Sequence, residues 1–141
     1  GWQSKVDTIN SQALTANTDN LIAFTGTDSS NEDLTLMNSV GKITPLKEGD
    51  CLSIDFAFSF PSPSGTTDFY SIKLKVNGVV YRAQSANILE PTGETNYASV
   101  SWTLPVEADF KTYGAEIFVN PNVAITISNR YLQVTRTHKG V

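Results

Sequence analysis

Residues 51–60, CLSIDFAFSF, decide the fold class of this chain. Large apolar residues alternate there with small or polar ones, and the apolar set is Leu52, Ile54, Phe56, Phe58 and Phe60. A period of two is the pattern of a β-strand with one buried face. Three phenylalanines on that face predict a central strand of the hydrophobic core.

A β-hairpin is predicted next along the chain, in FYSIKLKVNGVVYRAQSA, residues 69–86. Two β-rich runs flank Asn77-Gly78 in this stretch. An Asn-Gly pair favours a type I′ turn, because both central residues of that turn need positive φ. We therefore expect an antiparallel hairpin centred on Asn77-Gly78.

Short strand patterns continue on both sides of these two segments. Downstream candidates are residues 97–104, 115–119, 123–128 and 130–137, and weaker ones upstream are 21–25 and 34–38. Many short strands separated by Gly and Pro predict a sandwich or barrel. We expect an all-β, antiparallel jelly-roll sandwich of about eight or nine strands, formed by one domain over 21–141. Residues 1–20 look polar and irregular, so we expect them to be a lead-in from an upstream fibrous stalk.

Composition excludes several classes of function. The 141 residues carry a net charge of −4, and their ten Lys and Arg residues form no cluster. Nucleic-acid binding needs a concentrated positive patch, so no nucleic-acid partner is expected. No apolar run approaches the roughly 20 residues of a transmembrane helix. The single cysteine, Cys51, permits no intrachain disulfide and no thiolate metal cluster.

The residues that could support catalysis are few. The only histidine, His138, lies four residues from the end, where a solvated tail is the simpler interpretation. Cys51 lies on a predicted strand and has the surroundings of an inert thiol. An acidic loop at Asp28, Asn31, Glu32 and Asp33 lacks the EF-hand spacing for calcium. We expect no enzyme activity, no cofactor and no metal site.

Recognition is the remaining function, and sandwich folds bind through loops and edge strands. Residues that combine apolar area with a polar group are the natural candidates. By type these are Arg82, Tyr97, Arg130 and Tyr131. Half-buried strand packing is the alternative interpretation of each. The aromatic residues Phe110, Tyr113 and Phe118 are candidates for a subunit interface, because aromatic residues are enriched at interfaces but also fill cores.

Residues 40–141 resemble a known family of viral domains. The resemblance runs from LKEGDCLSIDFAFSF through IKLKVNGVVYRA to the closing ISNRYLQVTRTHKGV. These stretches are similar in style to the trimeric jelly-roll knobs at the tips of bacteriophage fibres and tail needles, above all the tail-needle knob of short-tailed phages. Such knobs share a TNF/C1q-like architecture.

The resemblance implies a homotrimer above an upstream stalk. It also implies a virion component that is assembled in the host cytoplasm and serves attachment to, or penetration of, the host envelope. The partner would be a host-surface glycan or outer-membrane protein, and a small ligand between subunits is a further option. A lone cysteine fits assembly in a reducing compartment.

Two other functions remain open from the residues alone. A carbohydrate-binding module of a bacterial extracellular enzyme would normally show a planar row of exposed Trp and Tyr. Only Trp2 and Trp102 are present, and Trp102 alternates with the inward residues of its strand. A small hydrolase would need a catalytic set that the sequence does not offer.

Overall fold

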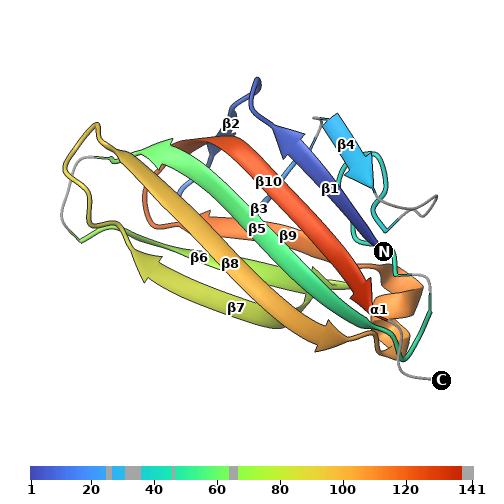
Figure 1. Cartoon of the computed structure of the whole chain (residues 1–141). Coiled ribbons are helices and arrows are strands. Elements are labelled where there is room, and N and C mark those ends of the chain that lie inside the picture. The colour runs from blue at the N-terminus through green and yellow to red at the C-terminus, as the bar shows by residue number, and fades with distance from the viewer. Residues whose placement is uncertain (25–26, 31–35, 46, 64–66, 138–141) are drawn as a thin grey trace.

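A computed structural model describes residues 1–24, 27–30, 36–45, 47–63 and 67–137. These residues form a six-stranded sheet and a four-stranded sheet packed face to face (Figure 1). The larger sheet has the order β4-β1-β10-β5-β8, with β2 also paired to β10, and the smaller has the order β3-β9-β6-β7. Every pairing of strands described is antiparallel. The predicted antiparallel sandwich is confirmed.

Strand β5 (Cys51–Pro61) is the central core strand that its alternation predicts. It lies between β10 and β8 (Thr95–Pro105), and its apolar side chains point between the sheets. The ring centroids of Phe56 and Phe58 are 5.3 Å apart, and Tyr70 of the opposite sheet lies 5.9 Å from Phe58. Aromatic contacts across the two sheets therefore hold the sandwich together.

The predicted hairpin is also confirmed. Strands β6 (Phe69–Val76) and β7 (Val79–Asn87) pair on either side of a two-residue turn. Asn77 has φ 50° and Gly78 has φ 77°, as a type I′ turn requires. Strand β7 is the edge of the four-stranded sheet.

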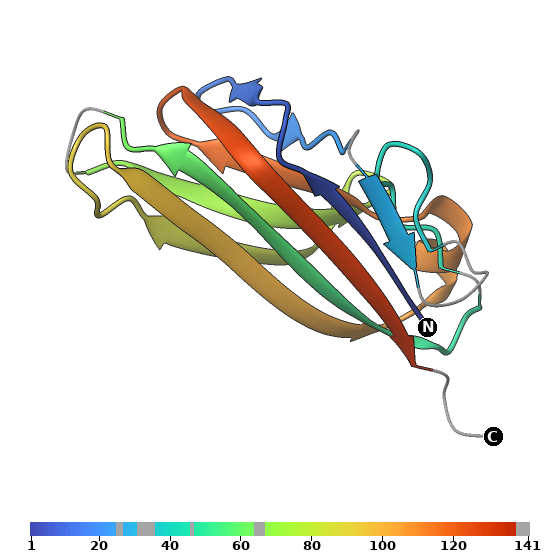
Figure 2. The ribbon, with the colours of Figure 1, turned by 45° about the horizontal axis from the view of Figure 1, so that its top comes forward.

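The two strands predicted at 123–128 and 130–137 are one strand, β10 (Ile125–Thr137). A β-bulge between Ser128 and Tyr131 shifts its register against β5, and Asn129 there has φ 51°. A bulge adds a residue without ending the strand, so the pattern of inward and outward residues changes phase. Figure 2 shows the continuous strand running the length of the sheet.

The expectation that residues 1–20 are irregular is corrected. Trp2–Asp7 form β1, which pairs residue by residue with β10, and Gln12–Leu14 form β2, which pairs with the start of β10. Hydrophobic alternation does not reveal β1, because the residues at its inward positions are polar. Gln3, Lys5 and Asp7 are all buried. The Oε1 atom of Gln3 accepts hydrogen bonds from the backbone of Leu36 and Met37. The upstream stalk stays a prediction.

The remaining elements are short. Strands β3 (Asn20–Leu21), β4 (Thr27–Ser30) and β9 (Glu116–Pro121) complete the sheets, and one helical turn and a half, α1 (Ala108–Tyr113), joins β8 to β9. Of the weak strand predicted at 21–25, Leu21 belongs to β3, residues 22–24 are loop, and Thr25 lies outside the described residues. Of the one predicted at 34–38, Leu34 and Thr35 lie outside the described residues, and Met37 forms an isolated bridge to Ile43.

The two ends of the sandwich differ in what they carry. At one end, which we call the terminal end, the backbone of Arg136 donates a hydrogen bond to Gly1. The opposite end, which we call the loop end, holds the β1–β2, β5–β6, β7–β8 and β9–β10 connections (Figures 1 and 2). Ile9 and Leu89, in two of these connections, are 91% and 83% exposed. Apolar residues are therefore presented to solvent far from Gly1 and from the end of β10.

Candidate functional site

The outer face of the six-stranded sheet is the surface with the most unusual composition, and we call it the polar face. Strand register places its side chains in rows that cross β8, β5, β10 and β1. One row is Ser101, Asp55, Gln133 and Ser4, and the next is Ser99, Ala57, Tyr131 and Val6. Flanking rows are Thr103, Ser53, Thr135 and Trp2 toward the terminal end, and Tyr97, Ser59 and Ser128 toward the loop end.

Asp55 is the only charged side chain in these four rows of described residues. The outer face of the four-stranded sheet is different. Asp19 there accepts hydrogen bonds from Lys73 at 2.8 Å and Lys75 at 2.6 Å, and Glu116 pairs across from Lys75. One sheet thus has the charged exterior of a solvated surface, and the other does not.

Side chains on the polar face satisfy one another laterally. The Ser101 hydroxyl donates a hydrogen bond to the Asp55 carboxylate, and the Tyr131 hydroxyl donates one to Oε1 of Gln133. Gln133 in turn donates to Thr135 at 3.4 Å. Burial, and then the nearby Asp55 charge, raise the pKa of Tyr131, which keeps its phenol protonated as a donor. Polar groups of this face therefore form hydrogen bonds with one another as well as with solvent.

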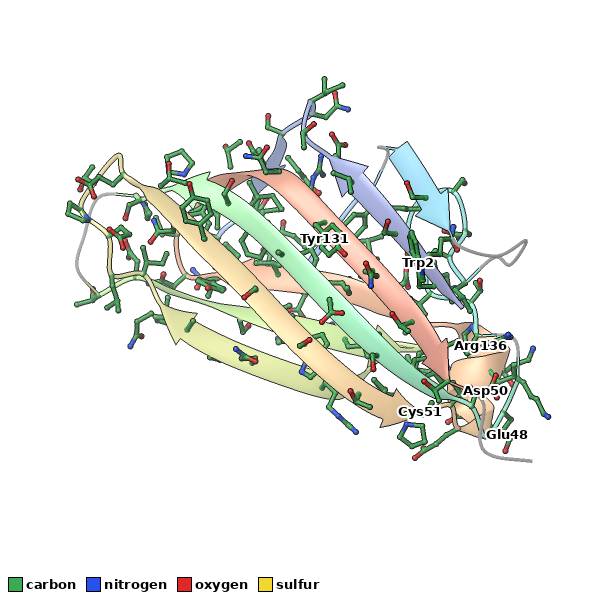
Figure 3. All side chains as sticks on the ribbon, in the orientation of Figure 1. Trp2, Glu48, Asp50, Cys51, Tyr131 and Arg136 are labelled. Carbon is green, nitrogen blue, oxygen red and sulfur yellow. The ribbon has the colours of Figure 1, made fainter. Side chains whose placement is uncertain are left out.

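A recess of about 300 Å³ opens on the polar face beside Tyr131. Ala57 and Ser99 are small and leave room there, and Asp55 and Ser101 border the space. Gln84 of β7 reaches it from the other sheet, so the recess extends to the open edge between β8 and β7. Figure 3 shows Tyr131 and Trp2 on strands of this sheet.

Arg130, predicted as a binding residue, is a structural residue, and that prediction is corrected. It is 2% exposed. Its guanidinium donates to Asp7 at 3.1 Å, to the Ala23 carbonyl at 2.7 Å and to the Asn10 carbonyl at 3.0 Å. The bulge in β10 turns this side chain inward, where it holds the N-terminal segment to the sandwich.

The three aromatic residues predicted for a subunit interface are not brought together. Phe110 is fully buried in the core of its own chain, edge-to-face with Tyr81, so it offers no surface to a second subunit. Tyr113 is exposed at the end of α1. Phe118 lies on the outer face of the four-stranded sheet, with the Lys75 ammonium 4.6 Å above its ring.

The other predicted binding residues lie on exposed surfaces. Tyr131 is at the centre of the polar face, and Tyr97, which is 84% exposed, is at its loop-end margin. Arg82 lies apart from both on the edge strand β7, and its guanidinium donates to the Tyr81 carbonyl. Sequence reasoning missed Asp55, Ala57, Ser99 and Ser101 as site residues. Their alternation was visible, but which strands lie side by side was not.

Chemistry-bearing side chains do not assemble elsewhere in the described part of the chain. No group of three or more His, Cys, Asp and Glu residues is placed there to hold a metal ion. His138 and Asn31, Glu32 and Asp33 of the acidic loop lie outside the described residues. At the terminal end, Arg136 lies 3.9 Å from the buried Asp50, beside Cys51 (Figure 3). No helix among the described residues is long and apolar enough to cross a bilayer.

Comparison with known proteins gives the fold. No protein-family model matches the sequence, and no curated protein matches it significantly. The globular domain of zebrafish complement 1qA protein is similar with a TM-score of 0.48 and 13% identity, over 94% of each chain. The structure of Eiger TNF from S. frugiperda is similar with a TM-score of 0.57 and 9% identity, over 99% of this chain and 95% of that one. The chain therefore has the jelly-roll fold of a TNF domain: the strand pattern predicts the jelly roll, and the resemblance to phage knobs implies the TNF-like form of it.

Proposed function

We propose that this chain is one subunit of a trimeric, non-enzymatic recognition domain that forms the tip of a bacteriophage fibre or tail needle. The observation that carries the proposal is the polar face, whose four rows of described residues hold one charged side chain, Asp55. Charged residues are depleted at the centre of protein interfaces, where their desolvation is costly. Open sheet faces and edges usually carry charges that keep them apart in solution. A face with few of them suits contact with another subunit.

The recess beside Tyr131 supports the same arrangement. A flat sheet face gains shape complementarity when it can accept a projecting side chain from a neighbour. The edge between β8 and β7 runs next to the recess and exposes nearly every residue of β7. In a closed ring, the edge of one subunit meets the face of the next, and this contact repeats around the axis. The three-fold symmetry comes from the resemblance to phage knobs.

The separation of the two ends favours a tip position. A stalk joined near Gly1 would meet the sandwich at its terminal end and leave the loop end pointing outward. The loop end carries exposed Ile9, Leu89 and Tyr97. Exposed apolar side chains can mark surfaces for contact with a partner or a membrane, and these three are the ones that such a stalk would leave outermost. Attachment to, or penetration of, a host envelope uses such an end, and a virion location follows from this role.

The trimer is tested by a charge placed on the polar face. Ala57→Arg puts a long cation at the recess without entering the core, because Ala57 points outward on β5. Ser71→Arg is the matched control, outward on the central strand β6 of the other sheet. Sedimentation should measure a mass of about three times the 15.3 kDa chain mass for the wild type and for Ser71→Arg. For Ala57→Arg it should measure the mass of one chain. A wild-type monomer would overturn the proposal, as would an Ala57→Arg trimer.

The attachment role needs its own measurement. Fluorescently labelled trimer should stain the surface of some bacterial strains and slow phage adsorption to those strains. A trimer that stains none of a broad strain panel would contradict attachment while leaving assembly intact. A carbohydrate-binding module is the second candidate, favoured by the exposed Tyr97 ring, and it predicts a monomer that sediments with insoluble polysaccharide.

A further inference from the structure

A second recess, of about 280 Å³, lies at the loop-end margin of the polar face. The ends of β5 and β8 and the bulge of β10 form it. Its lining includes Ser59, Pro61, Thr95, Tyr97, Ser128 and Asn129. We propose that this recess binds a neutral saccharide. The biological role of such binding, host recognition, rests on the proposed function above.

Tyr97 supplies an apolar platform. Its side chain is 84% exposed, although an aromatic ring on a strand is normally packed against neighbours. The face of an aromatic ring is electron-rich, and the C–H groups on one side of a pyranose carry partial positive charge. A sugar that lies flat on the ring therefore gains both contact area and an electrostatic term. The hydroxyl of Tyr97 remains at the edge as a donor or acceptor.

The other lining groups have the polarity of sugar hydroxyls. Ser, Thr and Asn side chains donate and accept hydrogen bonds, and no lining residue among those described is charged. Thr95, Tyr97 and Asn129 are all exposed, so the two hydroxyls and the Asn129 Oδ1 atom face solvent. They are thus available to a ligand. A phosphate or carboxylate would require cationic partners, which this lining does not provide.

The bulge holds part of the recess in a fixed shape. Asn129 adopts φ 51°, and its Nδ2 donates a hydrogen bond to Oγ of Ser59 at 3.1 Å. The Ser59 hydroxyl in turn donates a hydrogen bond to the carbonyl of Ser128 at 3.4 Å. These two hydrogen bonds fix the plane of the Asn129 amide, so its Oδ1 atom points in one direction. Bulges that aim a side chain in this way are typical of functional sites.

The direct test is NMR titration of the ¹⁵N-labelled protein with the methyl glycosides of glucose, galactose, mannose and rhamnose. At least one glycoside should shift the backbone amides of residues 95–97 and 128–129. Tyr97→Ala should weaken that binding about tenfold, the loss expected for one aromatic contact. Tyr113→Ala is the matched control, because it removes an exposed tyrosine at the terminal end. It should bind as the wild type does.

Each alternative outcome contradicts the proposal. No shift with any of the four glycosides would overturn it, as would shifts that Tyr97→Ala leaves unchanged. Shifts at the same amides with inorganic phosphate alone would mean an anion site instead. The sedimentation mass of Tyr97→Ala is measured on the same sample, so that a loss of assembly is distinguished from a loss of binding.

Discussion

Arg130 and Asp7 join the last strand of the chain to the first. Their ion pair at 3.1 Å is almost completely buried, and the arginine also binds two backbone carbonyls of the N-terminal segment. Removing one member of a buried ion pair leaves the other charge desolvated. The contacts of this single side chain therefore add to the backbone pairing that holds the polar strand β1 on the sheet.

Arg130→Ala should lower the free energy of unfolding by about 3–5 kcal/mol, the usual cost of breaking a buried ion pair. Arg82→Ala, which removes an exposed guanidinium from β7, should change it by less than about 0.5 kcal/mol. Chemical denaturation at one protein concentration measures both variants. Equal effects of the two substitutions would contradict the structural role of Arg130.

Asp19 gives the protein a specific acid response. Hydrogen bonds from Lys73, then Lys75, hold the pKa of its carboxyl well below the ordinary value of 3.8. The unfolded chain takes up a proton at that ordinary value while the folded chain does not, so folding stability falls as the pH drops below it. The advantage of the wild type over Asp19→Asn should be constant above pH ~5 and shrink below pH ~4.

This comparison is made by denaturant unfolding at several pH values. The group is partly exposed, so added salt should reduce the difference at neutral pH. A stability gap that grew on acidification would contradict the assignment.

Two glycines, one in the β6–β7 turn and one at the end of α1, differ in how much an added Cβ atom would destabilise the fold. Gly78 and Gly114 both have positive φ, at 77° and 72°. A Cβ at Gly78 would meet open space, whereas one at Gly114 would lie 2.7 Å from the Ile43 carbonyl. Gly78→Ala should cost about 1–2 kcal/mol of unfolding free energy from backbone strain alone. Gly114→Ala should cost about 1–3 kcal/mol more, because of that contact and because ψ of −178° puts Gly114 in a backbone region essentially restricted to glycine. Similar thermal stability of the two variants would show that the Ile43 loop yields easily.

At the scale of elements, the sequence predicts best where hydrophobicity and geometry agree. Strand β5 and the Asn77-Gly78 hairpin have both the right period and the right turn residues. Strand β1 has neither, because Gln3, Lys5 and Asp7 occupy its inward positions, and Gln3 and Asp7 are stabilised by distant partners. Such partners cannot be read from local pattern.

The candidate site was harder to predict than the fold. Tyr97 and Tyr131 were identified by residue type, and both lie on the polar face. Arg130 was misjudged because the bulge at Asn129 reverses which residues point inward. The low number of charged side chains on the polar face depends on the strand order. That order places β10 between β1 and β5, although the three strands are far apart in the chain.

At the scale of the whole molecule, the proposed assembly makes folding depend on concentration. A trimer that dissociates into single chains when it unfolds is stabilised by mass action. The melting temperature of the wild type should rise with protein concentration, and that of Ala57→Arg should not. Calorimetry over a hundredfold range of concentration, which changes the mass-action stabilisation by about 1.8 kcal/mol per chain, gives the measurement. A concentration-independent wild type would contradict an obligate trimer.

The adjacency of the first and last strands also has a mechanical consequence. Strand β1 is held to β10 along all six of its residues, and Gly1 lies beside the end of β10. Pulling Gly1 away from Thr137 would peel these bonds apart one pair at a time, at low force. Pulling Gly1 against the loop end, as a particle tethered through that end would do, loads all of them at once in shear. The same strand pair is therefore weak in one direction of force and strong in the other, and single-molecule pulling from the two geometries would measure the difference.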